Sequence, residues 1–120
     1  MRVAVVHTAG APCGCAEAVA KGLHALGHDV VFVDSAEIEL KVGEISRSCD
    51  LVIDHTDTFR GTGLLRPFVR GLLEAHGARI VGSDAGACFR ADDKIAAKTC
   101  LASAGIAVPP GVAVTSKKQK

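Results

Sequence analysis

Four short, mainly apolar runs are distributed over the first two thirds of the sequence, and they limit the possible folds more than any other feature. None is long enough for a helix, and none shows the polar–apolar alternation of a strand with one face in water. Short continuous runs of this kind are typical of strands buried on both faces of a parallel sheet. The runs are Val3–Val6, Val30–Val33, Leu51–Ile53 and Arg79–Val81.

The segments between these runs carry helix signals. Apolar residues recur at helical spacing after the first run, and Gly27 is a plausible end for that helix. Segment 36–48 fits neither period, so we expect a short helix or an irregular crossover there. The clearest helix is predicted over 64–76, where the apolar face is formed by Leu64, Leu65, Phe68, Val69, Leu72 and Leu73. The alternation predicts a small α/β domain whose mainly parallel sheet has four strands.

The bulk composition fits one folded domain. The chain has 120 residues, of which 48% are hydrophobic and 22% are charged, so a single buried core is feasible and disorder is not expected. The net charge is +1, but three lysines stand among the last four residues. Without Lys117, Lys118 and Lys120 the chain has 11 basic and 13 acidic residues, so nucleic-acid binding is not expected.

The number of cysteines and the apolar stretches indicate the cellular compartment of the protein. Five cysteines, an odd number, favour free thiols in a reducing environment. The charge-free stretch 99–116 is interrupted by Gly105 and Pro109, so no membrane span is predicted. Met1-Arg2 leads directly into the first apolar run, without the pattern of a secretory signal. We therefore expect a cytoplasmic protein with no membrane partner.

Polar residues follow each predicted strand. In a parallel sheet, ligands bind beyond the carboxyl ends of the strands, so the loops at 7–14, 34–36, 54–63 and 82–84 are the expected binding region. These loops supply His7, Thr8, Asp34, Asp54, His55, Thr56, Asp57, Arg60, Ser83 and Asp84.

Three of these residues have two interpretations each. The imidazole of His55 either hydrogen-bonds a substrate carboxylate or merely bonds Asp54 or Asp57. Arg60 either pairs with an anionic ligand or is a solvated loop residue. Asp34 stands where a ribose-binding acid would be, but the first loop has no G-x-G-x-x-G pattern, which favours helix capping instead.

Two further motifs bear on a metal, a thiol nucleophile or a phosphate. Cys13 and Cys15 have no second pair at zinc spacing, so no metal site is predicted, and no partner histidine supports a catalytic thiol. Lys94 follows two aspartates at the start of a predicted helix over 94–104. An aspartate there complements the helix dipole and a lysine does not, which favours a role for Lys94 in binding nucleotide phosphates over a solvated position.

Two segments carry a resemblance to a known family. LEAHGARIVGSD at 73–84 resembles the strand entry "LLE-x-x-G-I-P-x-x-G-S" of D-alanine–D-alanine ligases and related ATP-grasp enzymes. Asp93-Lys94, Lys98 and the segment ASAGIAVPP at 102–110 look like the family pattern "D-K-x-x-x-K-x-x-L-x-x-A-G-I-P-x-P". The likeness is strongest over 72–110 and extends more diffusely to 1–7 and 21–34.

The resemblance implies a three-layer, Rossmann-like pre-ATP-grasp domain over 1–90, and a helix and linker over 91–120 that lead toward an ATP-grasp lobe. It implies a reaction in which ATP phosphorylates a carboxylate and an amine attacks the acyl phosphate. By the same match, His55 and Ser83 contact substrate and Lys94 contacts ATP. No catalytic residue and no metal ligand is assigned to the chain.

The resemblance also implies cofactors and partners. ATP and Mg belong to the complete enzyme, and neither is expected to bind tightly to these 120 residues alone. The expected partners are the central and C-terminal ATP-grasp domains and a small amino acid or peptide. A homodimer through helix 64–76 and a place in peptidoglycan biosynthesis are further expectations.

The chain departs from the family in two loops. The first loop has no acidic residue over Gly10–Cys15, and the third loop reads HTDTFRG at 55–61. The substrate is therefore an open choice between small amino acids and peptides. The alternative function is a free-standing Rossmann-like module that binds a small ligand or a nucleotide at its strand ends.

Overall fold

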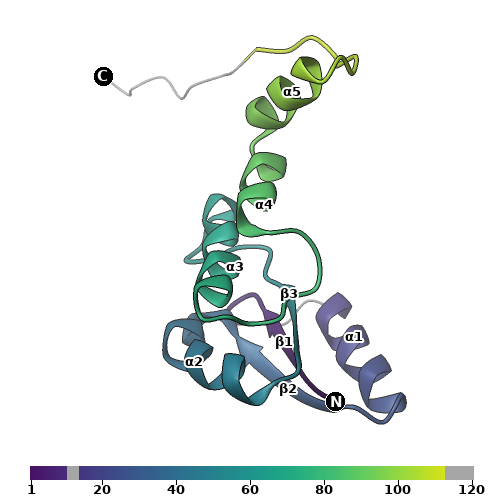
Figure 1. The fold of residues 1–120 in the computed structure, drawn as a ribbon, viewed down its shortest axis with the longest axis vertical. Coiled ribbons are helices and arrows are strands. Elements are labelled where there is room, and N and C mark those ends of the chain that lie inside the picture. The colour runs from purple at the N-terminus through teal and green to yellow at the C-terminus, as the bar shows by residue number, and fades with distance from the viewer. Residues whose placement is uncertain (11–13, 113–120) are drawn as a thin grey trace.

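The computed structural model of the chain describes residues 1–10 and 14–112, and its centre is a sheet of three parallel strands (Figure 1). The strands are β1 (Arg2–His7), β2 (Asp29–Asp34) and β3 (Leu51–His55), in the spatial order β2-β1-β3. His7 at the end of β1 stands level with the last residue of each neighbour. The predicted α/β class with a parallel sheet is confirmed.

The fourth predicted strand, Arg79–Val81, is wrong as a strand. The segment pairs with β3 only through an isolated parallel bridge between Val52 and Ile80. The Val52 N–H donates to the Arg79 carbonyl at 2.8 Å, and the Val81 N–H donates to the Val52 carbonyl at 2.9 Å. Gly82 comes next with a φ of +100°, a left-handed conformation that turns the chain out of the strand direction and ends the pairing.

Helices cover both faces of the sheet (Figure 1). One face packs against α1 (Gly14–Ala25), and the other packs against α2 (Ile38–Ser48) and α3 (Arg66–Ala75). Short 3₁₀ turns, η1 (Ser35–Glu37) and η2 (Gly63–Leu65), precede α2 and α3. The ambiguous segment 36–48 is therefore mostly a short helix, one of the two predicted outcomes.

The main core lies between the sheet and the helices α2 and α3. Burial of a large aliphatic side chain stabilises a fold by about 1.5–3 kcal/mol, so this cluster dominates the stability of the domain. Pro67 stands in the first turn of α3, where the absence of its N–H is tolerated as expected. The buried cluster consists of Ala4, Val6, Val33, Ile38, Val42, Ile45, Val52, Phe59, Val69 and Leu73.

Two further helices extend the chain away from the sheet (Figure 1). The first, α4 (Ala85–Asp92), is capped by Asp84, whose carboxylate accepts the Ala87 N–H at 2.6 Å. Sequence reasoning missed α4, although an aspartate before a small-residue segment is a typical N-cap signal. The second, α5 (Lys94–Ser103), is capped by Asp93, whose carboxylate accepts the Ile95 and Ala96 N–H groups.

Charged side chains fasten α4 to α3 at both ends. Arg66 donates from Nε and Nη2 to the two carboxylate oxygens of Asp92, each at 2.9 Å. At the other end, Glu74 Oε1 accepts the Ala85 N–H at 2.9 Å. Among residues 1–10 and 14–112, the helix α5 has no comparable anchor to the sheet domain, and it contains no buried residue.

Some sequence features lie outside the described residues. These are Cys13, the part of the charge-free stretch 99–116 beyond Val112, and the lysines at 117, 118 and 120. The four cysteines within the described ranges are all free thiols. Within those ranges, the helices include none that combines the length and the apolar character needed to cross a bilayer.

Candidate functional site

The three strands end in a row of polar residues. Asp34, His7 and His55 are paired across the sheet in one register, so their side chains leave on the same face, which is the face packed against α1. This edge is where the parallel sheet predicts a binding region. The structure therefore brings together three of the polar residues that the sequence placed at separate strand ends.

Asp34 joins the first loop to the segment after β2. Its Oδ1 accepts the Ala36 N–H at 2.7 Å, and its Oδ2 accepts the Gly10 N–H at 3.1 Å. The Ala36 hydrogen bond is the largest influence that lowers the pKa of Asp34, and the Gly10 bond and the nearby His7 add to it against the opposing effect of desolvation. Because both oxygens are engaged in holding backbone, the capping interpretation of Asp34 agrees with the structure.

The first and third loops are also joined directly. The Asp57 N–H donates to the Thr8 hydroxyl at 2.8 Å. The ring of His7 stacks on Phe32 with a centroid distance of 4.4 Å, and its Nδ1 lies 2.8 Å from the Thr8 carbonyl. A carbonyl can only accept, so Nδ1 carries the proton and Nε2 is the acceptor in the neutral ring.

His55 is half-buried at this edge, and no hydrogen bond of its imidazole is found within the described ranges. Asp54 is engaged elsewhere: its Oδ1 accepts the Thr56 N–H at 3.0 Å and its Oδ2 lies 3.6 Å from Arg70 Nε. The structural alternative for His55, a bond to Asp54 or Asp57, is therefore not found. Its imidazole is available to a ligand.

Ser83 lies on the exposed loop after the bridge segment, and a buried arginine holds that loop in place. Arg70 Nη1 donates to the Ser83 carbonyl at 2.6 Å and to the Val81 carbonyl at 3.1 Å. The side chains of Arg70 and Asp54 are only 9% and 6% exposed. The backbone position of Ser83 is thus fixed by an ion pair that sequence reasoning did not identify, because its two members are 16 residues apart.

Lys94 lies in a different region from His55 and Ser83. It stands in the first turn of α5 and lines a cleft of about 440 Å³ between α5 and the segment 108–112. Lys98 lines the same cleft, and its Nζ donates to the Pro109 carbonyl at 3.1 Å. Two ammonium groups beside one cleft fit an anionic group such as a phosphate. The structure does not bring this cleft together with the edge of the sheet (Figure 1).

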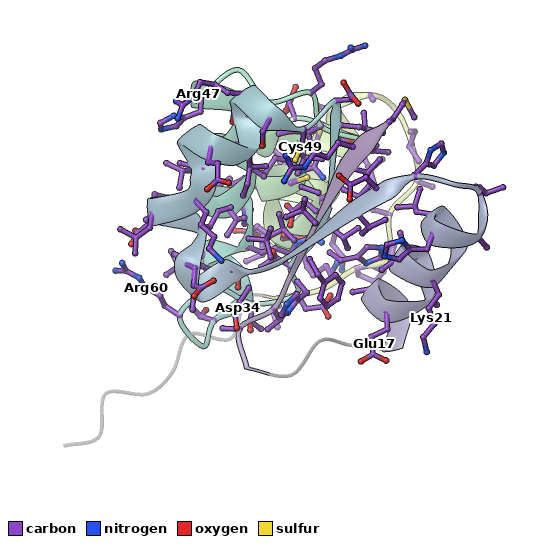
Figure 2. All side chains as sticks on the ribbon, turned by 90° about the horizontal axis from the view of Figure 1, so that it is seen from below. Glu17, Lys21, Asp34, Arg47, Cys49 and Arg60 are labelled. Atoms are coloured by element: carbon purple, nitrogen blue, oxygen red, sulfur yellow. The ribbon has the colours of Figure 1, made fainter. Side chains whose placement is uncertain are left out.

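Arg60 is held in an unusual backbone conformation at the same edge of the sheet as Asp34 (Figure 2). It is the one non-glycine residue with positive φ in the described part of the chain, at +50°, and Gly61 comes next at +78°. Phe59 and Thr62 exchange backbone hydrogen bonds at 3.0 and 3.1 Å, so residues 59–62 form a two-residue hairpin turn of type I′. Asn-Gly is the usual pair in such a turn, and a left-handed arginine is destabilised by about 1–2 kcal/mol.

The Arg60 side chain reaches across to α2. Its Nη2 lies 3.1 Å from both carboxylate oxygens of Glu39, and its guanidinium carbon lies 5.4 Å from the centre of the Phe59 ring. The two charged side chains are 66% and 47% exposed, so their pairing contributes about 0.2–1 kcal/mol at most. Together with Ala9, Ala36 and Phe59 they line a hollow of about 170 Å³. The sequence offered Arg60 as an anion ligand but gave no sign of its pairing with Glu39.

Metal ligands do not cluster in the described ranges, where no group of three or more His, Cys, Asp or Glu side chains is placed to hold an ion. The residues present fit a phosphate beside Lys94 and Lys98, but they offer no set of ligands for Mg²⁺.

Comparison with known proteins does not assign the chain to a family. No protein-family model, no curated protein and no solved structure matches it.

Proposed function

We propose that this chain is the N-terminal, substrate-binding domain of a cytoplasmic ATP-dependent carboxylate–amine ligase that resembles D-alanine–D-alanine ligase. Its sheet and flanking helices are compatible with the Rossmann-like domain that the resemblance implies. The proposal rests on the motifs at 72–110, and the placement of α5 is the structural observation that carries it.

The helix α5 contacts α4 and the segment 108–112, and it contains no buried residue. Ile95 is 56% exposed and Leu101 is 42% exposed, and Ile106 just after the helix is 53% exposed. A helix of ten residues is marginal in water without packing, and three large apolar side chains are left exposed on it and just after it. We therefore infer that α5 packs against the ATP-binding lobes of the complete enzyme.

The proposed roles follow from position. Bound ATP supplies the phosphoryl group that activates the substrate carboxylate. Lys94 and Lys98 place positive charge at the cleft beside α5, where they offset phosphate charge. His55 and Ser83 form part of the wall that orients the first substrate, a small amino acid or peptide. In this proposal the chain alone is inactive. We also propose that the complete enzyme acts in peptidoglycan biosynthesis and that it forms a homodimer.

A second candidate is a free-standing Rossmann-like module that binds a small ligand or a nucleotide at the strand ends. The hollow of about 170 Å³ beside Glu39 and Arg60 favours it, because the hollow lies at the same edge of the sheet as Asp34 (Figure 2). The two candidates differ in where ATP binds.

The test starts by sequencing the coding region on both sides of these 120 residues and expressing the whole reading frame. The proposal expects ADP release that depends on an added amino acid. It also expects Lys94→Met to raise the KM for ATP by about tenfold or more, the loss of one charged phosphate contact. Lys21→Met, on the exposed surface of α1, is the matched control and should leave the KM unchanged. A reading frame without ATP-binding lobes, or tight ATP binding by the 120 residues alone, would refute the proposal and favour the module.

A further inference from the structure

A small polar cavity lies between the end of β3, the start of α3 and the middle of α4. Its lining residues are Asp54, Arg66, Pro67, Arg70 and Cys88, and its volume is about 20 Å³. We propose that this cavity binds one water molecule, which accepts a hydrogen bond from an arginine and donates one to the Asp54 carboxylate. The inference does not depend on the ligase proposed above.

The Asp54 carboxylate can take one more donor than the described residues supply. Its side chain is only 6% exposed, and Oδ1 accepts the Thr56 N–H at 3.0 Å. Oδ2 has Arg70 Nε beside it at 3.6 Å, which is longer than an N–H···O hydrogen bond. No other donor reaches Oδ2 within residues 1–10 and 14–112. A buried charged oxygen without a donor has lost its hydration without a replacement, so a bound water at this position is favoured.

The two arginines that line the cavity still have N–H groups to donate. Arg66 uses Nε and Nη2 for Asp92, which leaves Nη1 without a partner in the described part of the chain. Arg70 uses Nη1 for the Val81 and Ser83 carbonyls, which leaves Nη2 without one in the same ranges. A water both accepts and donates hydrogen bonds, so one molecule can link an arginine N–H to the carboxylate oxygen.

The charged groups around the cavity are close enough to influence one another. The pKa of Arg66 is raised mainly by its hydrogen bonds to Asp92, against the opposing effect of desolvation. The charges of Cys88 and Asp54 add smaller contributions in the same direction. An arginine on α3 therefore interacts with a group on β3 and a group on α4, as expected of residues that share one polar cavity.

The size and the polarity of the cavity select water. One water needs roughly 10–15 Å³ on this measure, so a volume of about 20 Å³ holds one molecule and excludes larger solutes. Apolar cavities in proteins stay dry, but here every lining residue except Pro67 carries a polar group. A buried water typically makes about three hydrogen bonds, and Asp54, Arg66 and Arg70 offer partners for them.

The bridging water joins three elements of the fold. Asp54 is the residue before His55 on β3, and Cys88 stands one helical turn before Asp92 on α4. The water therefore links the polar edge of the sheet to the helix from which α5 extends.

A crystal structure of the 120-residue chain, grown with a reducing agent that keeps Cys88 a thiol, tests the proposal directly. The expected result is a density peak for one oxygen atom within about 2.5–3.2 Å of the Asp54 carboxylate and of a guanidinium nitrogen of Arg66 or Arg70. A cavity without such a peak, or one that holds an ion with anomalous scattering, would overturn the proposal.

Filling the cavity gives an independent test. Cys88→Val adds a methyl group at the cavity, and cysteine and valine have similar helix propensities. If the water bridges Asp54, its displacement should raise the equilibrium constant of unfolding at least about fivefold, measured by urea denaturation. In a dry cavity the added methyl group would improve the packing, so an unchanged or lower constant would contradict the bridge.

Two controls separate the loss of the water from crowding by the methyl group. In the Asp54→Asn background the side chain is neutral and needs the water less, so the effect of Cys88→Val should be at least about threefold smaller than in the unmodified chain. Crowding would act equally in both backgrounds, and an equal effect would refute the bridge. Cys100→Val makes the same change at an exposed position of α5 and should alter the constant by less than about twofold.

Discussion

The buried pair of Arg70 and Asp54 should be the most sensitive electrostatic contact in this domain. Arg70→Met removes the cation but keeps most of the buried aliphatic volume. It leaves the Asp54 carboxylate, 6% exposed, without its counter-charge, and it leaves the Val81 and Ser83 carbonyls without their donor. Removing one partner of a buried pair lowers the free energy of unfolding by about 3–5 kcal/mol. That is a large share of the roughly 5–15 kcal/mol that stabilises a typical domain.

The chain supplies a matched control one helical turn away. Arg66 also lies on α3 and also pairs with an aspartate, but the side chains of that pair are 36% and 28% exposed. Arg66→Met should therefore lower the free energy of unfolding by only about 1 kcal/mol. Both variants remove the guanidinium from an Arg–Asp pair, so the difference between them reports the burial of the Arg70 pair together with the two carbonyl contacts that Arg70 alone makes.

Urea denaturation followed by far-ultraviolet circular dichroism measures both variants, since the chain has no tryptophan and no tyrosine for fluorescence. In the Arg70→Met background, Asp54→Asn should restore at least about 1 kcal/mol, because it removes the unpaired charge and keeps an acceptor for the Thr56 N–H. Equal effects of Arg70→Met and Arg66→Met, within about 0.5 kcal/mol, would show that burial does not control the strength of these pairs.

Three further predictions use single contacts. Asp34→Asn should make the stability of the domain less sensitive to acid. The lowered pKa of Asp34 adds stability that is complete above its unfolded pKa of about 3.9 and is lost as the pH falls through the folded value. The urea midpoint should therefore change less between about pH 2 and 6 in the variant than in the unmodified chain. Asp93→Ala removes the acceptor for the Ile95 and Ala96 N–H groups and should weaken α5 by about 0.5–2 kcal/mol, seen as faster amide hydrogen exchange in α5 with unchanged global unfolding. Thr56→Val should raise the free energy of unfolding by about 1 kcal/mol, because the buried Thr56 hydroxyl has no partner among the described residues; a loss of stability would contradict this.

The parts of the fold that depend on local sequence could be predicted. Three apolar runs form the parallel strands, and Leu73 and Val69 place the face of α3 in the core as the helical period indicated. The prediction of a fourth strand was wrong because residues outside the apolar run limit its pairing. Gly82 turns the chain, and Arg70 donates hydrogen bonds to the Val81 and Ser83 carbonyls, so the segment pairs through one bridge only. The arginine contact joins residues distant in sequence, and no local pattern reports it.

The candidate site shows the same division. The polar edge with His7, Asp34 and His55 follows from the parallel direction of the strands, which the alternation of strands and helices predicted. The ion pair of Arg60 with Glu39 depends on a left-handed turn and on the direction of a long side chain from another element. Neither the turn conformation nor the direction of the side chain can be predicted from the spacing of residues in the sequence.

Asp93 is the single residue between α4 and α5, so the direction of the last helix is set by one pair of dihedral angles, φ −80° and ψ 109°. The ten residues of α5 extend about 15 Å at 1.5 Å per residue, and a rotation of about 20° at this joint moves the far end by about 5 Å. A lever of this length converts a small local adjustment into a displacement as large as the pitch of a helix. A domain packed against α5, as proposed above, would therefore be repositioned without disturbing any contact inside the sheet domain.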